Sequence, residues 1–537
     1  MRRWNGWGDE QFSLSLPDSG QDFLSDRIGP GRQLGNATLE AVCDQVPASR
    51  LPEHPAIHTD AETRVRHARG QSLEDWLAMR SGDFGPFPDG VAFPESGDMV
   101  RELLAFAKDE DLHIIPYGGG TSVAGHINPV DHGRPVLTID MGRMNRLLDL
   151  DEDSQIATFG AGTPGPLVES QLKPLGYTLG HFPQSFELST LGGWVASRSS
   201  GQQSLRYGRI EQLFAGGTVE SPEGTLTLPT IPASSAGPDV REMVLGSEGH
   251  LGLITEVKVR VTPIAEREQF HVLFFPDWEQ ARTAARRLVQ QKIQLSMLRL
   301  SNATETETQL ALAGHPKQIG LLETFLGWRG VADGKCMMTL GLTGSKAQYS
   351  AALKQLKALT KSYGGVYTGT YLGNKWAEKR FTMPYLREAL WDEGYAVDTL
   401  ETATDWNNVD HLMHTIESTL RDGLADEGKR VHVFTHLSHV YSQGCSIYTT
   451  YVFANGDDHD TTRRQWQRLK QSASEQIVHN GGTISHQHGV GKDHAPYLPV
   501  EKGALGMALI RGLGRTLDPD QRLSPDTLYA WNDKESS

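Results

Sequence analysis

The chain has 537 residues, of which 38% are hydrophobic and 8% aromatic, which is enough apolar surface for folded cores and excludes a wholly disordered protein. At ~100–200 residues per domain, this length predicts about three domains, or two large domains with terminal segments. The 51 lysines and arginines are outnumbered by 66 aspartates and glutamates, giving a formal net charge of −15. This acidic balance argues against nucleic acid as the main partner.

Cysteine content and terminal sequences predict the compartment. The three cysteines, Cys43, Cys336 and Cys445, lack metal-ligand spacing and cannot form a disulfide framework, which favours a reducing compartment. No apolar run approaches the ~18 residues of a membrane span. The start, MRRWNGWGDEQF, lacks the apolar stretch of a secretory signal, and the end, NDKESS, is not the peroxisomal tripeptide. We expect a cytoplasmic protein, with peripheral membrane contact left open.

Residues 1–87 are predicted to form an N-terminal helical segment. Helical stretches over Asp60–Ser81 are interrupted at Gly70. Ser72 is a predicted N-cap, because Asp75 stands three residues later in the position of a capping box.

Residues 88–263 mix strand–helix units with strand-rich stretches. A helix is predicted at Gly97–Lys108, followed by a strand at His113–Pro116 that runs into a glycine loop. Another helix is predicted at Gly165–Pro174. Further strands are predicted at residues 91–94, 136–140, 155–160, 213–220 and 252–262. The mixture indicates an α+β fold rather than a plain doubly wound sheet.

Residues 264–499 repeat strand–helix rounds typical of a sheet with helices on one face. Strands are predicted at residues 270–278, 333–342, 431–439 and 445–453, and helices at residues 279–292, 346–362 and 461–480. Residues 500–537 are predicted to begin as a helix and continue into the sequence LDPDQRLSP.

The strongest functional signal is the glycine loop PYGGGTS at Pro116–Ser122. Successive glycines let backbone N–H groups form a concave nest around an anion, and the hydroxyls add donors. The loop is neither G-x-G-x-x-G nor a P-loop, which disfavours an NAD-type Rossmann site and a nucleotide triphosphatase. Alone, three glycines would more often be an ordinary turn.

Two further loops share this chemistry. QSFELSTLGGWVASRSS at residues 184–200 places hydroxyls ahead of a small-residue helix, and GSEGHLGLI at residues 246–254 feeds a strand. Together with the first loop they predict a site for one large dinucleotide.

Two clusters near the C-terminus have acid–base character. Ser485–Lys492 reads SHQHGVGK, and its paired histidines suit proton transfer or anion binding. H-x-H also suits a metal ion, but no third ligand with motif spacing follows, so we expect no metal. In CSIYTTY, Tyr448 and Thr450 point to one face of a strand. Satisfied structural histidines and a core tyrosine remain the alternatives.

The ordered series PYGGGTS, SFELSTLGGWVASRSSGQQSLRYGRIE and GSEGHLG resembles the FAD-binding domain of the vanillyl-alcohol-oxidase (PCMH-type) superfamily, and within it the alkyldihydroxyacetonephosphate synthases. The resemblance runs from RWNGWG near the start to LDPDQRLSP near the end. It implies a PCMH-type FAD-binding domain at residues 88–263 and an α/β cap domain with an antiparallel sheet at residues 264–499. It also implies that residues 500–537 pack back on the FAD domain.

The resemblance implies FAD contacts in the three loops. We expect noncovalent FAD, because relatives that tether FAD do so through a histidine in the glycine loop, and this loop has none. Gln184 stands where members commonly have an acidic residue. The implied cofactor-binding residues are Pro116, Tyr117, Gly118, Gly119, Gly120, Thr121, Ser122, Gln184, Ser185, Phe186, Glu187, Leu188, Ser189, Thr190, Ser197, Arg198, Ser199, Ser200, Glu248, Gly249, His250, Leu251, Gly252, Leu253 and Ile254.

By the same resemblance, the chain would exchange the acyl group of acyl-dihydroxyacetone phosphate for a fatty alcohol in ether lipid synthesis, without net redox change. Tyr448 occupies the position of the catalytic tyrosine and would help to deprotonate C1, after its pKa is perturbed by the cavity. His486 and His488 are the other catalytic candidates, whereas Gln487 replaces the middle histidine of the family pattern. Arg387 would hold the substrate phosphate. A homodimer is also expected.

Arg299 matches another functionally sensitive arginine of the family and is assigned to substrate binding, with a salt-bridged structural residue as its alternative. Two other functions stay open. An FAD-dependent D-2-hydroxy acid dehydrogenase or oxidase is disfavoured, because His439–Tyr448 lacks the GDGN core of the metal-binding HxGDGNxH pattern and ends in tyrosine. A flavoprotein that binds lipid without turnover is motivated by Gln487. Chain length and physiological role are not predicted.

Overall fold

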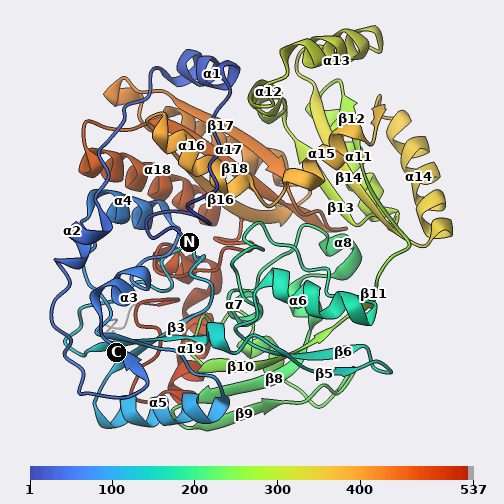
Figure 1. Ribbon diagram of the computed structural model, residues 1–537. Helices are drawn as coiled ribbons and strands as arrows, with labels where there is room; N and C mark the ends of the chain where they lie inside the picture. Colours follow the sequence, from blue (N-terminus) through green and yellow to red (C-terminus); the bar gives the residue numbers. More distant parts are fainter. Residues whose placement is uncertain (530–537) are drawn as a thin grey trace.

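The computed structural model describes residues 1–529, in which the N-terminal segment wraps one side of two sheet-containing regions (Figure 1). Its helices are α1 (Asp18–Ile28), α2 (Leu39–Cys43), α3 (Ala61–Arg66) and α4 (Leu73–Ser81). The predicted capping box is confirmed: Ser72 Oγ accepts from Asp75 N and the Asp75 carboxylate accepts from Ser72 N, both at 3.1 Å. Residues 530–537, with the NDKESS sequence, lie outside the described residues.

Two sheets organise the region that carries the glycine loops. The first has the order β1-β2-β4-β3, with β2, β4 and β3 parallel. Its strands are β1 (Ile57–His58), β2 (Gly90–Ala92), β3 (His113–Tyr117) and β4 (Val136–Asp140). The second is antiparallel with the order β5-β6-β10-β8-β9. Its strands are β5 (Leu147–Asp151), β6 (Ile156–Gly160), β8 (Phe214–Ser221), β9 (Gly224–Leu228) and β10 (Leu253–Arg260).

Short helices connect these strands, and a small two-stranded sheet pairs β7 (Tyr177–Thr178) with β11 (Thr262–Pro263). The helices are α5 (Gly97–Asp109), α6 (Gly165–Leu172), α7 (Leu191–Ser197), α8 (Ser204–Tyr207), α9 (Ile210–Leu213) and α10 (Val240–Val244). The predicted strand that enters the glycine loop is β3. The α+β class is confirmed by one partly parallel and one antiparallel sheet in the same region.

The cap region is built on a seven-stranded antiparallel sheet with the order β15-β12-β14-β13-β17-β18-β16. Its strands are β12 (Arg267–Phe275), β13 (Met297–Ser301), β14 (Cys336–Gly344), β15 (Val366–Gly369), β16 (Tyr395–Asp405), β17 (Val431–Leu437) and β18 (Gly444–Ala454). Its helices are α11 (Trp278–Gln290), α12 (Ala303–Leu312), α13 (Pro316–Trp328), α14 (Lys346–Lys361), α15 (Tyr371–Lys379), α16 (Leu386–Asp392), α17 (Val409–Asp422) and α18 (His459–His479).

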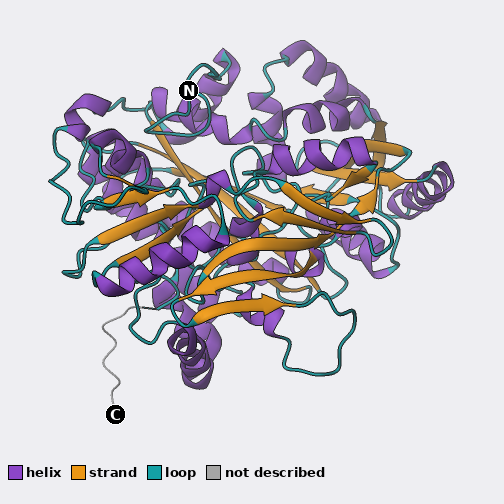
Figure 2. Cartoon of the chain, turned by 60° about the horizontal axis from the view of Figure 1, so that its bottom comes forward, coloured by secondary structure: helices purple, strands orange, loops and turns teal. Residues whose placement is uncertain are grey.

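Helices cover both faces of this sheet, so the expectation of one covered face is wrong. Strand β12 shows why, since its side chains alternate between two cores. Leu273 and Phe275 belong to the large core beneath α11 and α14. Val272 and Phe274 instead pack with Leu326 of α13. After a rotation of 60°, strands run through the middle of the molecule with helices on both sides (Figure 2).

The C-terminal helix α19 (Leu498–Leu517) leads back to the first sheet. Ile114 N donates to Arg522 O at 2.8 Å, and Ser524 N donates to Ile114 O at 2.9 Å, so residues 522–524 lie along the edge of β3. The domain boundaries drawn from the sequence remain predictions. Among the helices of residues 1–529, none is long and apolar enough to cross a membrane.

A buried carboxylate joins the N-terminal turn to the cap. Glu388 in α16 is 4% exposed and pairs with Arg3 at 3.3 Å and with Arg80 of α4. Its Oε1 also accepts from Trp7 N at 3.3 Å. An added Cβ at Gly6 would collide with this carboxylate, which explains the glycine there. The cluster fixes α16, the helix that presents Arg387.

We expect Glu388→Gln to lower the free energy of unfolding by about 3 kcal/mol, because it leaves two arginine charges without their buried counter-charge. Urea unfolding of purified protein measures the loss. The control is Asp426→Asn, which breaks an exposed 2.8 Å pair with Arg468 and should leave the free energy of unfolding almost unchanged. Equal losses in the two variants would contradict a special role for Glu388.

Candidate active site

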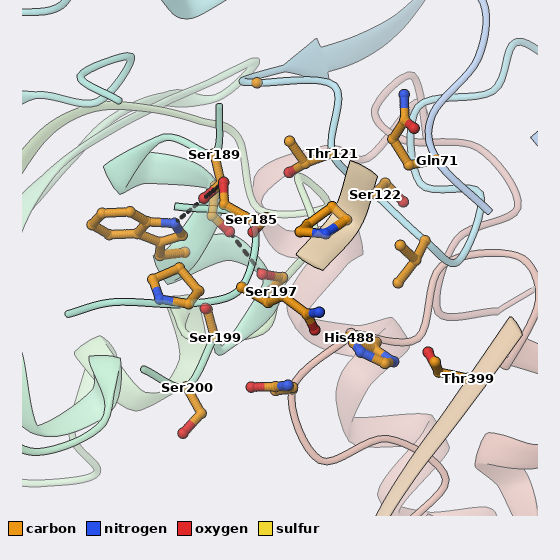
Figure 3. Close-up of a pocket in the computed structure, with 18 of the residues that line it drawn as sticks. Gln71, Thr121, Ser122, Ser185, Ser189, Ser197, Ser199, Ser200, Thr399 and His488 are labelled. Carbon is orange, nitrogen blue, oxygen red and sulfur yellow. Dashed lines mark hydrogen bonds between the residues drawn. The ribbon is translucent and has the colours of Figure 1, made fainter. Parts of the chain in front are cut away.

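A cavity of about 470 Å³ lies where the glycine loops meet the cap sheet (Figure 3). Its wall contains 19 of the 25 predicted cofactor-binding residues: Pro116, Tyr117, Gly118, Gly119, Gly120, Thr121, Ser122, Gln184, Ser185, Ser189, Thr190, Ser197, Ser199, Ser200, Glu248, Gly249, Gly252, Leu253 and Ile254. Four predicted catalytic or substrate-binding residues also line it: Arg299, Arg387, Tyr448 and His488. The structure therefore brings three loops and the cap residues into one site.

The glycines of the first loop permit close contact with the second loop. A Cβ at Gly118 would lie 2.5 Å from Thr190 Oγ1, and a Cβ at Gly119 would collide with the carbonyl of Leu188. Gly120 has φ +63°, a conformation that favours glycine. Loop packing is thus a second reason for the glycines, beside the anion nest predicted from the sequence.

Hydroxyl groups line one side of the cavity, with His488 and Thr399 across from them (Figure 3). Ser189 Oγ accepts from Trp194 Nε1 at 2.7 Å, and Thr190 Oγ1 accepts from Gly193 N at 3.3 Å. These bonds hold the second loop against α7. A cradle of small residues, hydroxyls and backbone amides fits the pyrophosphate of a dinucleotide such as FAD.

Six predicted cofactor contacts lie outside the cavity wall, because their side chains serve the protein interior or surface. The Phe186 ring stacks on Phe381 at 4.8 Å, and the Glu187 carboxylate accepts from Tyr385. His250 contacts Thr527. The six residues are Phe186, Glu187, Leu188, Arg198, His250 and Leu251: Leu188 and Leu251 pack in hydrophobic cores, and Arg198 pairs with Glu242. Their contacts with FAD stay predictions.

A partly buried histidine, not singled out from the sequence, supports the glycine loop. Ser122 Oγ lies 2.5 Å from His126 Nδ1, and His126 Nε2 lies 3.1 Å from Glu248 Oε1. Burial alone would lower the pKa of His126, but Glu248 outweighs it and the pKa is raised. Glu248 also accepts from the backbone N–H groups of Val490 and Gly491. One carboxylate therefore links the first loop, the third loop and Ser485–Lys492, the histidine segment.

Tyr448 faces the cavity from β18, as strand alternation predicts. Its hydroxyl donates to Gln184 Oε1 at 3.3 Å, and its ring lies edge-on to His488 with 6.0 Å between ring centres. Burial raises the pKa of Tyr448 to about 12. Burial therefore opposes formation of a phenolate, and the role of Tyr448 as a base stays a prediction. A phenol that keeps its proton acts as a hydrogen-bond donor.

The two predicted catalytic histidines have different surroundings. His488 lines the cavity, and burial lowers its pKa, so its ring is neutral at pH 7 and can accept a proton. His486 is not in the cavity wall and its side chain is only 3% exposed. Its Nδ1 lies 3.2 Å from Glu401 Oε1, and its Nε2 lies 2.7 Å from the Tyr441 hydroxyl. His486 therefore lies behind the cavity wall, in contact with Glu401 and Tyr441, and its catalytic role stays a prediction.

Gln487, the departure from the family pattern, lines the cavity beside His488. An uncharged amide thus stands where the family pattern places a titratable ring.

One histidine of the H-x-H motif, His486, belongs to a group of side chains that could hold a metal ion. Ligand atoms of Glu401, His439 and His486 lie within 4.8 Å of one another. However, Arg209 Nη1 lies 3.1 Å from His486 Nε2, and this fixed positive charge opposes a cation beside it. We interpret the group as a hydrogen-bond network; the absence of a metal remains a prediction.

Arg387 reaches the cavity with its guanidinium over Trp76, 5.0 Å from the ring centre. It donates to the carbonyls of Gln71 at 2.5 Å and Val397 at 3.2 Å, and to Asp398 at 3.3 Å. A guanidinium has five N–H donors. The Nε–H and one Nη1–H of Arg387 therefore have no part in these bonds.

Arg299, in β13, makes the salt bridge that its alternative interpretation predicted. Its Nη2 lies 2.6 Å from Glu305 Oε1 and 3.2 Å from His436 Nδ1. Burial opposes ionisation of Glu305, but His436 and Arg299 hold the pKa of this carboxyl at about 2. Arg299 lines the cavity as well, so the two interpretations are compatible.

Several wall residues had no sequence signal. Gln71, Trp76, His126, Glu305, Asp398 and His436 come from several parts of the chain and share no motif spacing. Glu401 lies directly behind the wall, paired with Tyr448 across β16 and β18.

Two family models match the chain. The FAD binding domain matches residues 88–228, and the C-terminal domain of FAD linked oxidases matches residues 264–528. The chain therefore carries an FAD-binding domain, and FAD is its cofactor.

Known proteins of similar sequence cover almost the whole chain. An alkyldihydroxyacetonephosphate synthase from Trypanosoma brucei brucei is 31% identical, over 98% of this chain and 92% of that protein. A protein of the same name from Dictyostelium discoideum is 30% identical, over 99% of this chain and 95% of that protein.

Solved structures agree. An alkyldihydroxyacetonephosphate synthase has a TM-score of 0.84 and 27% identity, over 98% of this chain and 99% of that one. The 4-ethylphenol oxidase from Gulosibacter chungangensis shares the fold, with a TM-score of 0.69 and 11% identity over 97% and 99% of the two chains. From the FAD-binding loops, the cap residues and these full-length matches, we conclude that the chain belongs to the alkyldihydroxyacetonephosphate synthase family of FAD-dependent enzymes.

Proposed function

We propose that the chain exchanges the acyl group of acyl-dihydroxyacetone phosphate for a fatty alcohol, without net redox change. The observation that carries this proposal is the convergence of the FAD loops with Arg387, Tyr448 and His488 on one cavity, in a chain similar to the synthases along its length. When bound, FAD would supply the flavin ring as a catalyst that turns over without net reduction.

The charged end of the substrate is assigned to Arg387. The guanidinium is held rigidly by two carbonyls and Asp398, and its remaining N–H groups suit phosphate oxygens. The apolar chain is assigned to the part of the cavity lined by Met297, Leu312, Leu386, Leu390 and Phe434.

Proton transfer is assigned to His488, with Tyr448 as a donor. A neutral imidazole can accept the C1 proton, whereas a phenol with a raised pKa cannot supply phenolate at pH 7. The Tyr448 hydroxyl would donate a hydrogen bond to the oxygen that gains charge as C1 loses its proton.

The D-2-hydroxy acid dehydrogenase alternative is less supported. Matches such as D-lactate dehydrogenase of Saccharomyces cerevisiae reach 23% identity, and the GDGN core of the metal-binding pattern is missing here. Bleaching of the flavin by a 2-hydroxy acid without oxygen would favour it.

Lipid substrates are compatible with peripheral membrane contact. Exposed apolar side chains on α13, Leu321 and Trp328, support such contact, because α12, the helix before it, lines the cavity. Membrane contact, the homodimer and the cytoplasmic location stay predictions.

FAD is expected to be released by acid into the supernatant. The glycine loop has no histidine, and both ring nitrogens of the neighbouring His126 are engaged with Ser122 and Glu248. Absorbance of the supernatant and of the precipitate after trichloroacetic acid treatment measures this, and a yellow precipitate would contradict noncovalent binding.

Arg387→Ala should raise the KM for the phosphorylated substrate at least tenfold while FAD stays bound, since a hydrogen bond to a charged group contributes ~1.5–3 kcal/mol. The matched variant is Arg387→Lys, which keeps the charge but loses the planar set of N–H donors. Its KM should fall between the KM of the native enzyme and that of Arg387→Ala. An unchanged KM in Arg387→Ala would remove this residue from the phosphate site.

Tyr448→Phe should lower kcat by about 10²–10³ with little change in KM, the cost of losing one positioned donor. His488→Ala should stop the loss of tritium from C1 of the acyl substrate. If His488→Ala releases label at the native rate and Tyr448→Phe does not, the base is the tyrosine and our assignment is wrong.

A further inference from the structure

Glu401 is a fully buried carboxylate in the middle of β16, the strand at one edge of the cap sheet. It lies on β16, opposite Tyr448 on β18, and its side chain has no exposed surface. Burial opposes its ionisation, yet hydrogen bonding to His486 and the surrounding histidines hold its pKa far below the usual range. Glu401 therefore carries a fixed negative charge directly behind the cavity.

One oxygen of this carboxylate holds the histidine segment in place. Glu401 Oε1 accepts from Ser438 Oγ at 2.8 Å and lies 3.2 Å from His486 Nδ1. Since Arg209 can only donate, its 3.1 Å contact makes His486 Nε2 an acceptor and places the ring hydrogen on Nδ1, toward Glu401. The backbone N–H of His486 also donates to Glu401 O at 3.1 Å.

The other oxygen faces the catalytic ring. Glu401 Oε2 is buried and has no hydrogen-bond partner among the described residues, and His488 Nε2 lies 3.9 Å away. A buried carboxylate oxygen without a partner is costly, and a ring N–H turned toward it relieves the cost.

We propose that Glu401 is the positioning residue for His488: it fixes the segment through His486 and keeps the hydrogen of His488 on Nε2, so that Nδ1 accepts the proton from C1 of the substrate. This role rests on the proposed function. The C1–H bond breaks, its electron pair stays with the carbon next to the ketone, and the proton moves to Nδ1. The resulting imidazolium forms beside a carboxylate that is already ionised, so its charge is compensated where it appears.

Other charges around His488 are arranged less closely. Asp398 on β16 also favours the protonated ring, whereas Lys470 of α18 and His486 of the same segment oppose it. The ring of Tyr448 is at 6.0 Å, and His494 is a buried histidine whose pKa is lowered by burial to about 3. Glu401 is the nearest anion and the largest of the charges that raise the pKa of His488.

The test compares Glu401→Gln, which keeps the shape and removes the charge, with the native holoenzyme. Label release from C1 should fall about 100-fold, with the KM within threefold. The acidic limb of its pH profile should move to lower pH, because removing a nearby negative charge lowers the pKa of His488. FAD content and melting temperature verify folding. An unmoved limb, or a change confined to KM, would overturn the proposal.

Glu305→Gln is the matched control. Glu305 is also a buried carboxylate at the cavity and pairs with a histidine and an arginine, His436 and Arg299. Removing the charge of Glu305 should raise the KM, because Arg299 loses its partner. The acidic limb of the pH profile should stay where it is in the native enzyme. If both variants move the limb equally, the effect is general charge loss and the role of Glu401 falls.

Two further measurements cover other failures. If Glu401→Gln does not fold, Glu401→Asp withdraws the charge by one methylene and should move the limb in the same direction, but less. ¹⁵N NMR of selectively labelled histidine, assigned with His488→Gln, should show the Nε2–H form of His488 in the native protein and its loss in Glu401→Gln. This readout needs no turnover, so a native enzyme that makes no ether product refutes the proposed function, whereas an unchanged tautomer refutes the role of Glu401.

Discussion

The site depends on ionised carboxylates placed in the interior of one β-strand. Asp398 and Glu401 of β16 are 5% and 2% exposed, and such charges are tolerated only when donors and cations surround them. Asp398 accepts from Trp466 at 2.7 Å and Tyr451 at 3.2 Å and pairs with Arg387. Glu401 lies beside His486 and His488. The two residues thereby hold Arg387 and the segment that carries His488 in place.

The same constraint separates the roles of the polar groups in the cavity. Burial raises the pKa of Tyr448 and lowers the pKa of His488, which in the proposed function makes the tyrosine a donor and the histidine an acceptor. Both shifts disfavour charge in the resting site. The charges that do persist, on Arg387 and Glu401, are compensated by fixed partners and need little reorganisation during a reaction.

Much of the fold was predicted from short-range signals in the sequence. The capping box at Ser72, the strand entering the glycine loop and the alternation around Tyr448 depend on neighbouring residues and were predicted correctly. Strand β16 was missed, because its acidic residues read as surface while the fold buries them. The prediction also missed that helices cover both faces of the cap sheet, because this depends on long-range packing of α13.

The candidate site divides in the same way. Motifs located the three loops, but they could not tell which side chains of a loop face the cavity, as Glu187 and His250 show. They also could not separate His486 from His488, because the distinction depends on Glu401 and Arg209, which are distant in sequence. Tertiary contacts alone supply that information.

The most direct test of the account is one turnover experiment with ¹⁸O-labelled fatty alcohol and acyl-dihydroxyacetone phosphate, followed by mass spectrometry and flavin absorbance. The account predicts an ether product that retains the ¹⁸O, release of the acyl chain as free fatty acid, and a flavin that ends the cycle oxidised. Absence of the ether product, together with a flavin reduced by a 2-hydroxy acid under anaerobic conditions, would contradict it.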